Sequence, residues 1–64
     1  MKVYKVWCEY DLEWNLTENV AMYRTEKKMI EDLESKDWDE VGYGNWEAAR
    51  EAGMLDVEAM WLEW

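Results

Sequence analysis

Every even-numbered position from Tyr4 to Leu16 is apolar. The set comprises Tyr4, Val6, Cys8, Tyr10, Leu12, Trp14 and Leu16. Because successive side chains of a β-strand point to opposite faces, a period of two places all seven on one face of a strand. The odd positions between them are polar except for Trp7. The pattern predicts one long strand over residues 4–16 with one buried face, and it places Trp7 either under a second layer or in an interface.

A polar triplet, Thr17-Glu18-Asn19, follows this segment and is suited to a three-residue hairpin turn. Such a turn places Leu16 opposite Val20 and Trp14 opposite Met22. This register keeps both apolar sets on one face, whereas a shift by one residue would expose Val20 and Met22, so we favour it over a turn at Glu13-Trp14-Asn15. We therefore expect a β-hairpin with its second strand beginning near Val20.

Two helices are predicted in the middle of the chain. The first begins after a Thr25 N-cap and runs to about Lys36, with an apolar stripe of Met29, Ile30 and Leu33. The second spans residues 46–52, between an Asn45 N-cap and a Gly53 C-cap.

The last segment, residues 55–64, alternates for most of its length and is interpreted as a strand. Asp56 is also a possible N-cap of a helix carrying Val57, Met60, Trp61 and Trp64, and periodicity alone leaves that alternative open. The expected fold is one domain over residues 1–64, of class α+β, in the order β-β-α-α-β with the helices on one face of a small sheet.

Six tryptophans and four tyrosines are many for 64 residues. A domain of this size buries only about 60% of the surface that its unfolded chain exposes. We therefore expect some tryptophans on the surface, in a patch of the kind that marks protein–protein contacts. The candidates are Trp7, Trp14, Trp38, Trp46, Trp61 and Trp64. Because the tryptophans cannot all be buried, we expect the chain either to self-associate, as a homodimer, or to bind a dedicated partner.

The whole net charge of −9 lies in the second half of the chain. Residues 1–28 carry five acids and five bases, whereas residues 29–64 carry eleven acids against Lys36 and Arg50. Such a field repels nucleic acid and anionic membranes and attracts a basic protein surface. The predicted partner-binding residues are the acids of residues 31–40 with two neighbouring tryptophans: Glu31, Asp32, Glu34, Asp37, Trp38, Asp39, Glu40 and Trp46.

The residue types argue against catalysis and cofactors. The chain has no histidine, which is the commonest general base and metal ligand. The single cysteine, Cys8, alternates with Val6 and Tyr10 on the predicted buried face, where a thiol behaves as a small hydrophobe. We expect no enzymatic activity, no cofactor and no metal. The absence of a signal-peptide pattern and of a long apolar run indicates a cytoplasmic chain with no membrane partner.

The segment Asp37–Gly42 is similar to the opening of an EF-hand calcium loop, with acids at the first and third positions and glycine at the sixth. Val41 occupies a ligand position, however, and Ala48 stands where the loop requires glutamate. A solvated acidic loop is the preferred interpretation.

A short, acidic, proline-free and tryptophan-rich domain that starts Met-Lys-Val-Tyr-Lys-Val resembles, in composition and size, the small acidic accessory proteins of bacteriophages. These include inhibitors of host nucleases and other defence enzymes. The resemblance implies a non-catalytic inhibitor that occupies the nucleic-acid site of a host enzyme, as a mimic of nucleic acid. Two other classes stay open: a self-associating structural module whose acids only provide solubility, and a binder that uses a Trp/Tyr cage for a cationic or planar ligand.

Overall fold

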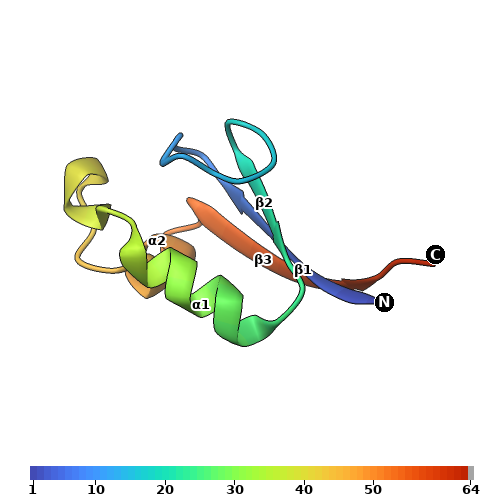
Figure 1. The fold of residues 1–64 in the computed structure, drawn as a ribbon. Helices are drawn as coiled ribbons and strands as arrows, with labels where there is room; N and C mark the ends of the chain where they lie inside the picture. Colours follow the sequence, from blue (N-terminus) through green and yellow to red (C-terminus); the bar gives the residue numbers. More distant parts are fainter. Residues whose placement is uncertain (64) are drawn as a thin grey trace.

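The computed structural model describes residues 1–63, and Trp64 lies outside the described residues. The chain forms β1 (Lys2–Cys8), β2 (Val20–Tyr23), α1 (Glu26–Ser35), the 3₁₀ helix η1 (Trp38–Val41), α2 (Trp46–Glu51) and β3 (Leu55–Trp61). The strands form an antiparallel sheet in the order β2-β1-β3. Both α-helices lie on the same face of this sheet (Figure 1). The α+β fold and its β-β-α-α-β order are confirmed, and the last segment is a strand rather than a helix.

Both predicted N-caps are present. The Thr25 hydroxyl accepts a hydrogen bond from the Lys28 amide at 3.1 Å, and the Asn45 side-chain oxygen accepts one from the Ala48 amide at 2.8 Å. These bonds pair amides that have no partner within the first turn of a helix. Gly53 follows α2 with φ of 83°, a left-handed conformation that glycine adopts without strain. Both helices therefore begin where the sequence predicts.

The core lies between the sheet and the helices. The sheet contributes Val6, Cys8, Ala21, Tyr23 and Leu55, and the helices contribute Met29, Leu33 and Ala49. Two tryptophans, Trp14 from the segment between β1 and β2 and Trp38 from η1, complete the cluster. Trp14 and Trp38 are 8% and 4% exposed.

The first strand is shorter than predicted, because β1 ends at Cys8 and residues 9–19 form a loop. The inward-facing pattern nevertheless continues through this loop, in which Trp14 is buried. The turn depends on Glu13, whose φ is 64°, and on the Asp11 carboxylate, which accepts a hydrogen bond from the Glu13 amide at 3.2 Å. An Asp side chain that bonds the amide two residues on stabilises a turn without glycine or proline. Alternation of apolar residues does not reveal such a turn.

The predicted pairing of β2 with residues 14–16 as a regular strand is also wrong, although the Leu16 amide does donate a hydrogen bond to the Val20 carbonyl oxygen at 3.1 Å. β2 pairs with the middle of β1, with Val6 opposite Ala21 and Tyr4 opposite Tyr23, rather than with residues 14–16. Leu16 is 57% exposed. Because the loop turns at Glu13, its second half returns along the outer side of β2. There, side-chain and backbone groups of the loop make the hydrogen bonds that a regular neighbouring strand would make.

The opposite face of the sheet carries Val3, Lys5 and Trp7 from β1. Val3 is 4% exposed, whereas Trp7 is 43% exposed. Within residues 1–63, no helix covers this face (Figure 1). Trp7 is therefore on the surface and is not covered by a second layer among the described residues.

Within residues 1–63, no helix has the length and apolar character that a membrane span needs.

Candidate functional site

Acidic residues from four separate segments line two hollows. One of these segments contains η1, which lies at the end of the molecule away from the chain termini (Figure 1). We call this region the acidic end and define it by residues from loop 9–19, α1, the segment 37–40 and α2. It comprises Asp11, Glu13, Glu34, Asp37, Asp39, Glu40 and Glu47. All seven residues are exposed. The chain reverses here because Gly42, at φ of 91°, ends η1 and directs the backbone toward α2.

Two neighbouring hollows divide the acidic end. One, of about 440 Å³, is bordered by the carboxylates of Asp11, Glu13, Asp37 and Glu40. The other, of about 370 Å³, lies beside Trp46 and is bordered by the carboxylates of Glu34, Asp37, Asp39 and Glu47. Asp37 and Lys36 border both hollows. The arrangement concentrates negative charge on a concave surface, where low-dielectric walls strengthen the field.

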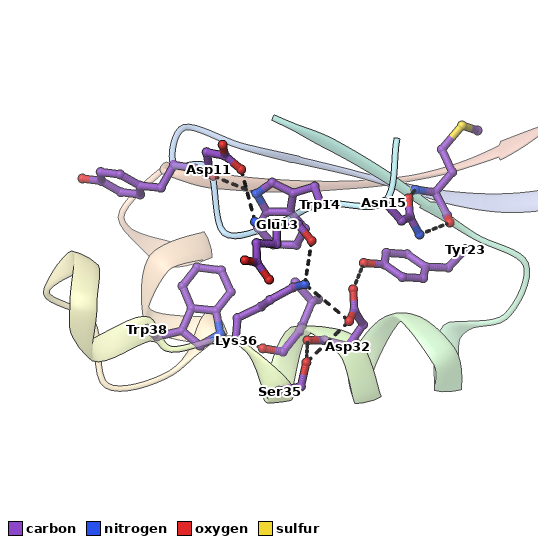
Figure 2. Close-up of polar contacts among 12 residues, drawn as sticks. Asp11, Glu13, Trp14, Asn15, Tyr23, Asp32, Ser35, Lys36 and Trp38 are labelled. Carbon is purple, nitrogen blue, oxygen red and sulfur yellow. Dashed lines mark hydrogen bonds and ion pairs between the residues drawn. The ribbon is translucent and has the colours of Figure 1, made fainter. Parts of the chain in front are cut away.

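Lys36 is the cation of this region, and its amine is already engaged (Figure 2). It donates a hydrogen bond to the Glu13 carbonyl oxygen at 3.1 Å and lies 3.5 Å from the Asp32 carboxylate. It also lies 5.1 Å from the centroid of the Trp14 ring, within cation–π range. Lys36 therefore joins loop 9–19 to α1, and its charge is directed toward the protein rather than toward a partner.

Asp32 is turned toward the sheet (Figure 2). Its carboxylate accepts a hydrogen bond from the Tyr23 hydroxyl, in addition to the Lys36 contact. Burial, and secondarily the bond to Asp32, raises the pKa of Tyr23 well above its usual range. Glu31, by contrast, is exposed and shares a surface hollow with Lys28. Of the predicted partner-binding acids, Asp32 therefore makes contacts within the protein, and Glu31 lies near Lys28.

Trp38 does not lie on the surface, so the expectation of an exposed tryptophan among the carboxylates is wrong for this residue. Its indole N–H donates a hydrogen bond to the Leu33 carbonyl oxygen at 2.7 Å. Leu33 is in the last turn of α1, where carbonyl groups have no partner within the helix. The Trp38 ring also packs against Trp14, with ring centroids 6.2 Å apart. Trp38 therefore lies mostly beneath the acidic end. Trp38 and Trp46 both line one of its hollows, and Trp46, which is only partly buried, is the more exposed of the two.

Three acids of this region were missed by the sequence analysis. Asp11 and Glu13 were expected on the solvent side of a long strand, and the turn at Glu13 brings them beside Asp37 and Glu40 instead. Glu47 was recognisable as an acid in the first turn of α2, directly after Trp46. Its place beside Glu34 depends on how α2 packs relative to α1, which spacing along the chain does not reveal.

The remaining chemistry-bearing groups are structural. Cys8 is completely buried, and burial is the main cause that raises the pKa of its thiol, so the thiol is uncharged at neutral pH. The EF-hand-like opening folds as η1. Among residues 1–63, no group of three or more His, Cys, Asp or Glu side chains is placed to hold a metal ion.

Comparison with known proteins does not assign the chain to a family. No protein-family model, no curated protein and no solved structure matches it.

Proposed function

We propose that this protein is a non-catalytic inhibitor that binds a basic, nucleic-acid-binding site of another protein through its acidic end. The observation that carries the proposal is the convergence of seven exposed carboxylates from four segments, with the Lys36 amine turned inward. A surface that served only solubility would not need its carboxylates grouped around shared hollows, with the nearby cation engaged elsewhere.

The hollow beside Trp46 suits a cationic side chain. Its volume of about 370 Å³ accommodates the end of a lysine or arginine side chain, and its lining has four acidic residues and two tryptophans against one cation, Lys36. Arginine stacks on aromatic faces and binds carboxylates through two parallel hydrogen bonds. The partner's basic residues would therefore find both an ionic and an aromatic contact in one place.

The support beneath the acidic end favours tight binding. Trp14 and Trp38 donate indole hydrogen bonds to the Tyr10 and Leu33 carbonyl oxygens, both at 2.7 Å. These bonds hold loop 9–19 and the end of α1 in place under the carboxylates. Pre-organised groups lose less conformational entropy on association than mobile ones.

The same carboxylates explain why the target would be a nucleic-acid-binding site. A protein that holds DNA places Lys and Arg side chains against an array of phosphates. An array of carboxylates offers such a protein the same charge, whereas nucleic acid itself is repelled by this surface. If the chain is encoded by a phage, as the resemblance implies, it would act in the host cytoplasm on a host defence or nucleic-acid enzyme.

The experiment compares two triple amide variants of equal net charge. Asp37→Asn, Asp39→Asn and Glu40→Gln neutralise the acidic end, and Glu18→Gln, Glu51→Gln and Glu63→Gln neutralise three exposed acids outside it. The immobilised chains are exposed to a bacterial lysate treated with nuclease, and retained proteins are eluted with increasing salt or with duplex DNA. The parent and the control should retain a basic protein that salt and DNA both release, because screening weakens exposed charge pairs.

The first triple variant should lose that protein while keeping the parent's circular dichroism spectrum, since exposed acids contribute little to stability. Equal retention by all three chains, or elution indifferent to salt, would contradict the proposal. The acids would then serve solubility only, and the protein would belong to the class of self-associating structural modules.

A further inference from the structure

The two edges of the sheet differ in how their backbone groups are used. At the outer edge of β2, the Asn15 side chain donates to the Met22 carbonyl oxygen at 3.0 Å and accepts from the Met22 amide at 2.9 Å. The amides of Leu16 and Thr17 both donate to the Val20 carbonyl oxygen, at 3.1 and 3.0 Å. Loop 9–19 therefore occupies this edge, and no further strand can pair there without displacing the loop.

The outer edge of β3 has no such cover. Met1 and Leu62 exchange two backbone hydrogen bonds, of 2.7 and 2.8 Å, and the Glu9 amide donates to Met54 at 2.9 Å. Because hydrogen-bonded pairs alternate along an antiparallel ladder, the even-numbered residues of β3 direct their backbone groups toward β1. The N–H and C=O groups of Leu55, Val57, Ala59 and Trp61 therefore point outward. Among residues 1–63, no hydrogen bond engages them.

Several features that usually protect an edge strand are missing from β3, although Asp56 and Glu58 give it two charged side chains. The strand is seven residues long, contains neither lysine nor proline, and pairs with β1 in a continuous register without a bulge. Trp61, near its end, is 75% exposed. β1 and β3 also extend past the helices toward the chain termini, so the edge is accessible there (Figure 1).

We propose that two copies of the chain pair through their β3 edges, antiparallel, and form one continuous six-stranded sheet. This dimer interface goes beyond the proposed inhibitor function and does not depend on it. A two-fold axis through Ala59 gives a register in which Ala59 lies opposite Ala59 of the second copy and Val57 lies opposite Trp61. The three central pairs would exchange about six backbone hydrogen bonds.

Side chains disfavour the registers shifted toward the start of β3, and an axis at Met60 would keep only the two Ala59–Trp61 pairs inside the strand. An axis at Glu58 would place two Glu58 carboxylates directly opposite each other, and an axis at Val57 would place Asp56 opposite Glu58, both of which are destabilising. The axis at Ala59 places Glu58 opposite Met60 and lays the exposed Trp61 indole on Val57. Within each copy, Lys5 is the β1 partner of Glu58 and supplies a nearby counter-charge.

The antiparallel arrangement also separates the bulky and charged parts of the two copies. The first residue of β3, Leu55, is the part of the strand nearest to α2 along the chain, and α2 packs against β3. Antiparallel pairing therefore puts the two α2 helices at opposite ends of the interface. The acidic ends, which lie away from the termini, point away from each other and limit repulsion between two chains of net charge −9.

Cysteine cross-linking tests the register. In a Cys8→Ala background, Ala59→Cys should form an intermolecular disulfide under mild oxidation, because directly opposed residues of a hydrogen-bonded pair have Cα atoms about 5.5 Å apart. Val57→Cys in the same background is the matched control and should not form one, since it lies opposite Trp61 rather than its own copy. Preferential cross-linking of the Val57→Cys variant would overturn the register.

Sedimentation tests the edge itself. Ala59→Pro removes an outward N–H and no bond to β1, so it should keep the monomer fold by circular dichroism and weaken the dimer about tenfold or more. Trp7→Lys, on the uncovered sheet face, should leave the dimer intact. A parent chain that stays monomeric from micromolar to millimolar concentration would overturn the proposal. So would a dimer that Trp7→Lys abolishes and Ala59→Pro does not.

Salt separates this inference from the inhibitor proposal. Dimer formation between like-charged chains should strengthen as salt rises, whereas binding of a basic partner should weaken. Ala59→Pro should lose the dimer and still bind the partner if both proposals hold. A parent chain that is monomeric in every salt condition and still binds the partner would contradict only the dimer.

Discussion

The acidic end and the β3 edge use their aromatic residues in opposite ways. At the acidic end, Trp14 and Trp38 lie beneath the surface with their indole N–H groups bonded to backbone carbonyls, and the surface above them is charged. At the β3 edge, Trp61 is 75% exposed beside unpaired backbone groups. The first region is built to repel copies of itself and attract opposite charge. Under our proposal, the second extends the sheet into a second copy.

The difference shows that tryptophan content alone does not identify a binding surface. What distinguishes the two regions is whether the indole N–H and the neighbouring backbone groups have partners inside the protein. Trp38 has a partner in the last turn of α1, so its burial is compatible with a small core. The outward groups of β3 have none among residues 1–63, which is why Trp61 marks the open side of the molecule.

Removing one tryptophan from each region gives the strongest test of whether the two regions use their aromatic residues differently. Trp38→Ala should destabilise the fold by about 3–5 kcal/mol, because it opens a cavity and leaves the Leu33 carbonyl without its indole donor. Trp61→Ala should change the stability of the monomer by less than about 0.5 kcal/mol. Urea denaturation at low protein concentration measures both. Similar losses for the two variants would show that the aromatic residues of the two regions are not used differently.

Removing the Asn15 side chain should make the edge of β2, which loop 9–19 occupies, resemble the open edge of β3. Asn15→Ala deletes the two side-chain hydrogen bonds to Met22 and should cost about 1–2 kcal/mol. It should also allow association through β2, seen as species larger than a dimer in sedimentation. Thr17→Ala, in the same loop but without contact to Met22, is the control. An Asn15→Ala variant that associates no further than the parent would mean that the loop is not what protects β2.

The dependence of stability on alkaline pH tests whether Asp32 makes internal contacts rather than facing a partner. The pKa of Tyr23 is raised in the folded state by burial and by its bond to Asp32, so the unfolded phenol ionises first. This contribution to stability is complete below pH about 10 and is lost as pH rises beyond it. Tyr23→Phe should cost about 1 kcal/mol at neutral pH and show a shallower alkaline loss. Equal alkaline slopes for the two proteins would contradict this assignment.

The smallest expected effect concerns the turn at Glu13, which lies within the acidic end. Glu13 has φ of 64°, a conformation that costs a non-glycine residue about 1 kcal/mol. Glu13→Gly should therefore stabilise the fold slightly, by up to about 1 kcal/mol, whereas Glu18→Gly, in the same loop without a left-handed φ, should not. Thermal denaturation of both variants is the measurement. A destabilised Glu13→Gly variant would show that the side chain, rather than the turn conformation, is what the loop requires.

Local rules predicted the parts of the fold that depend on near neighbours in the chain. Thr25 and Asn45 cap helices because their side chains reach amides three residues ahead, and these caps were recognisable from residue type and position. The alternation from Val57 to Trp61 likewise indicated β3. The charge asymmetry, the α+β class and the exposure of some tryptophans also followed from composition and pattern.

Tertiary structure decided what depends on residues far apart in sequence. The left-handed turn at Glu13 carries no glycine or proline signal, so the sequence pattern extended the first strand by eight residues and misplaced the hairpin register. The same turn brings Asp11 and Glu13 to the acidic end and Asn15 to the edge of β2. Trp38 is buried with its indole N–H bonded to the Leu33 carbonyl oxygen in the last turn of α1, which also accepts a hydrogen bond from the Lys36 amide. Sequence spacing determined which segments are helices and strands. Long-range hydrogen bonds decided which acidic residues converge and which sheet edge stays open. These bonds join segments that are distant in the chain, and no local sequence pattern encodes how far apart such segments lie in space.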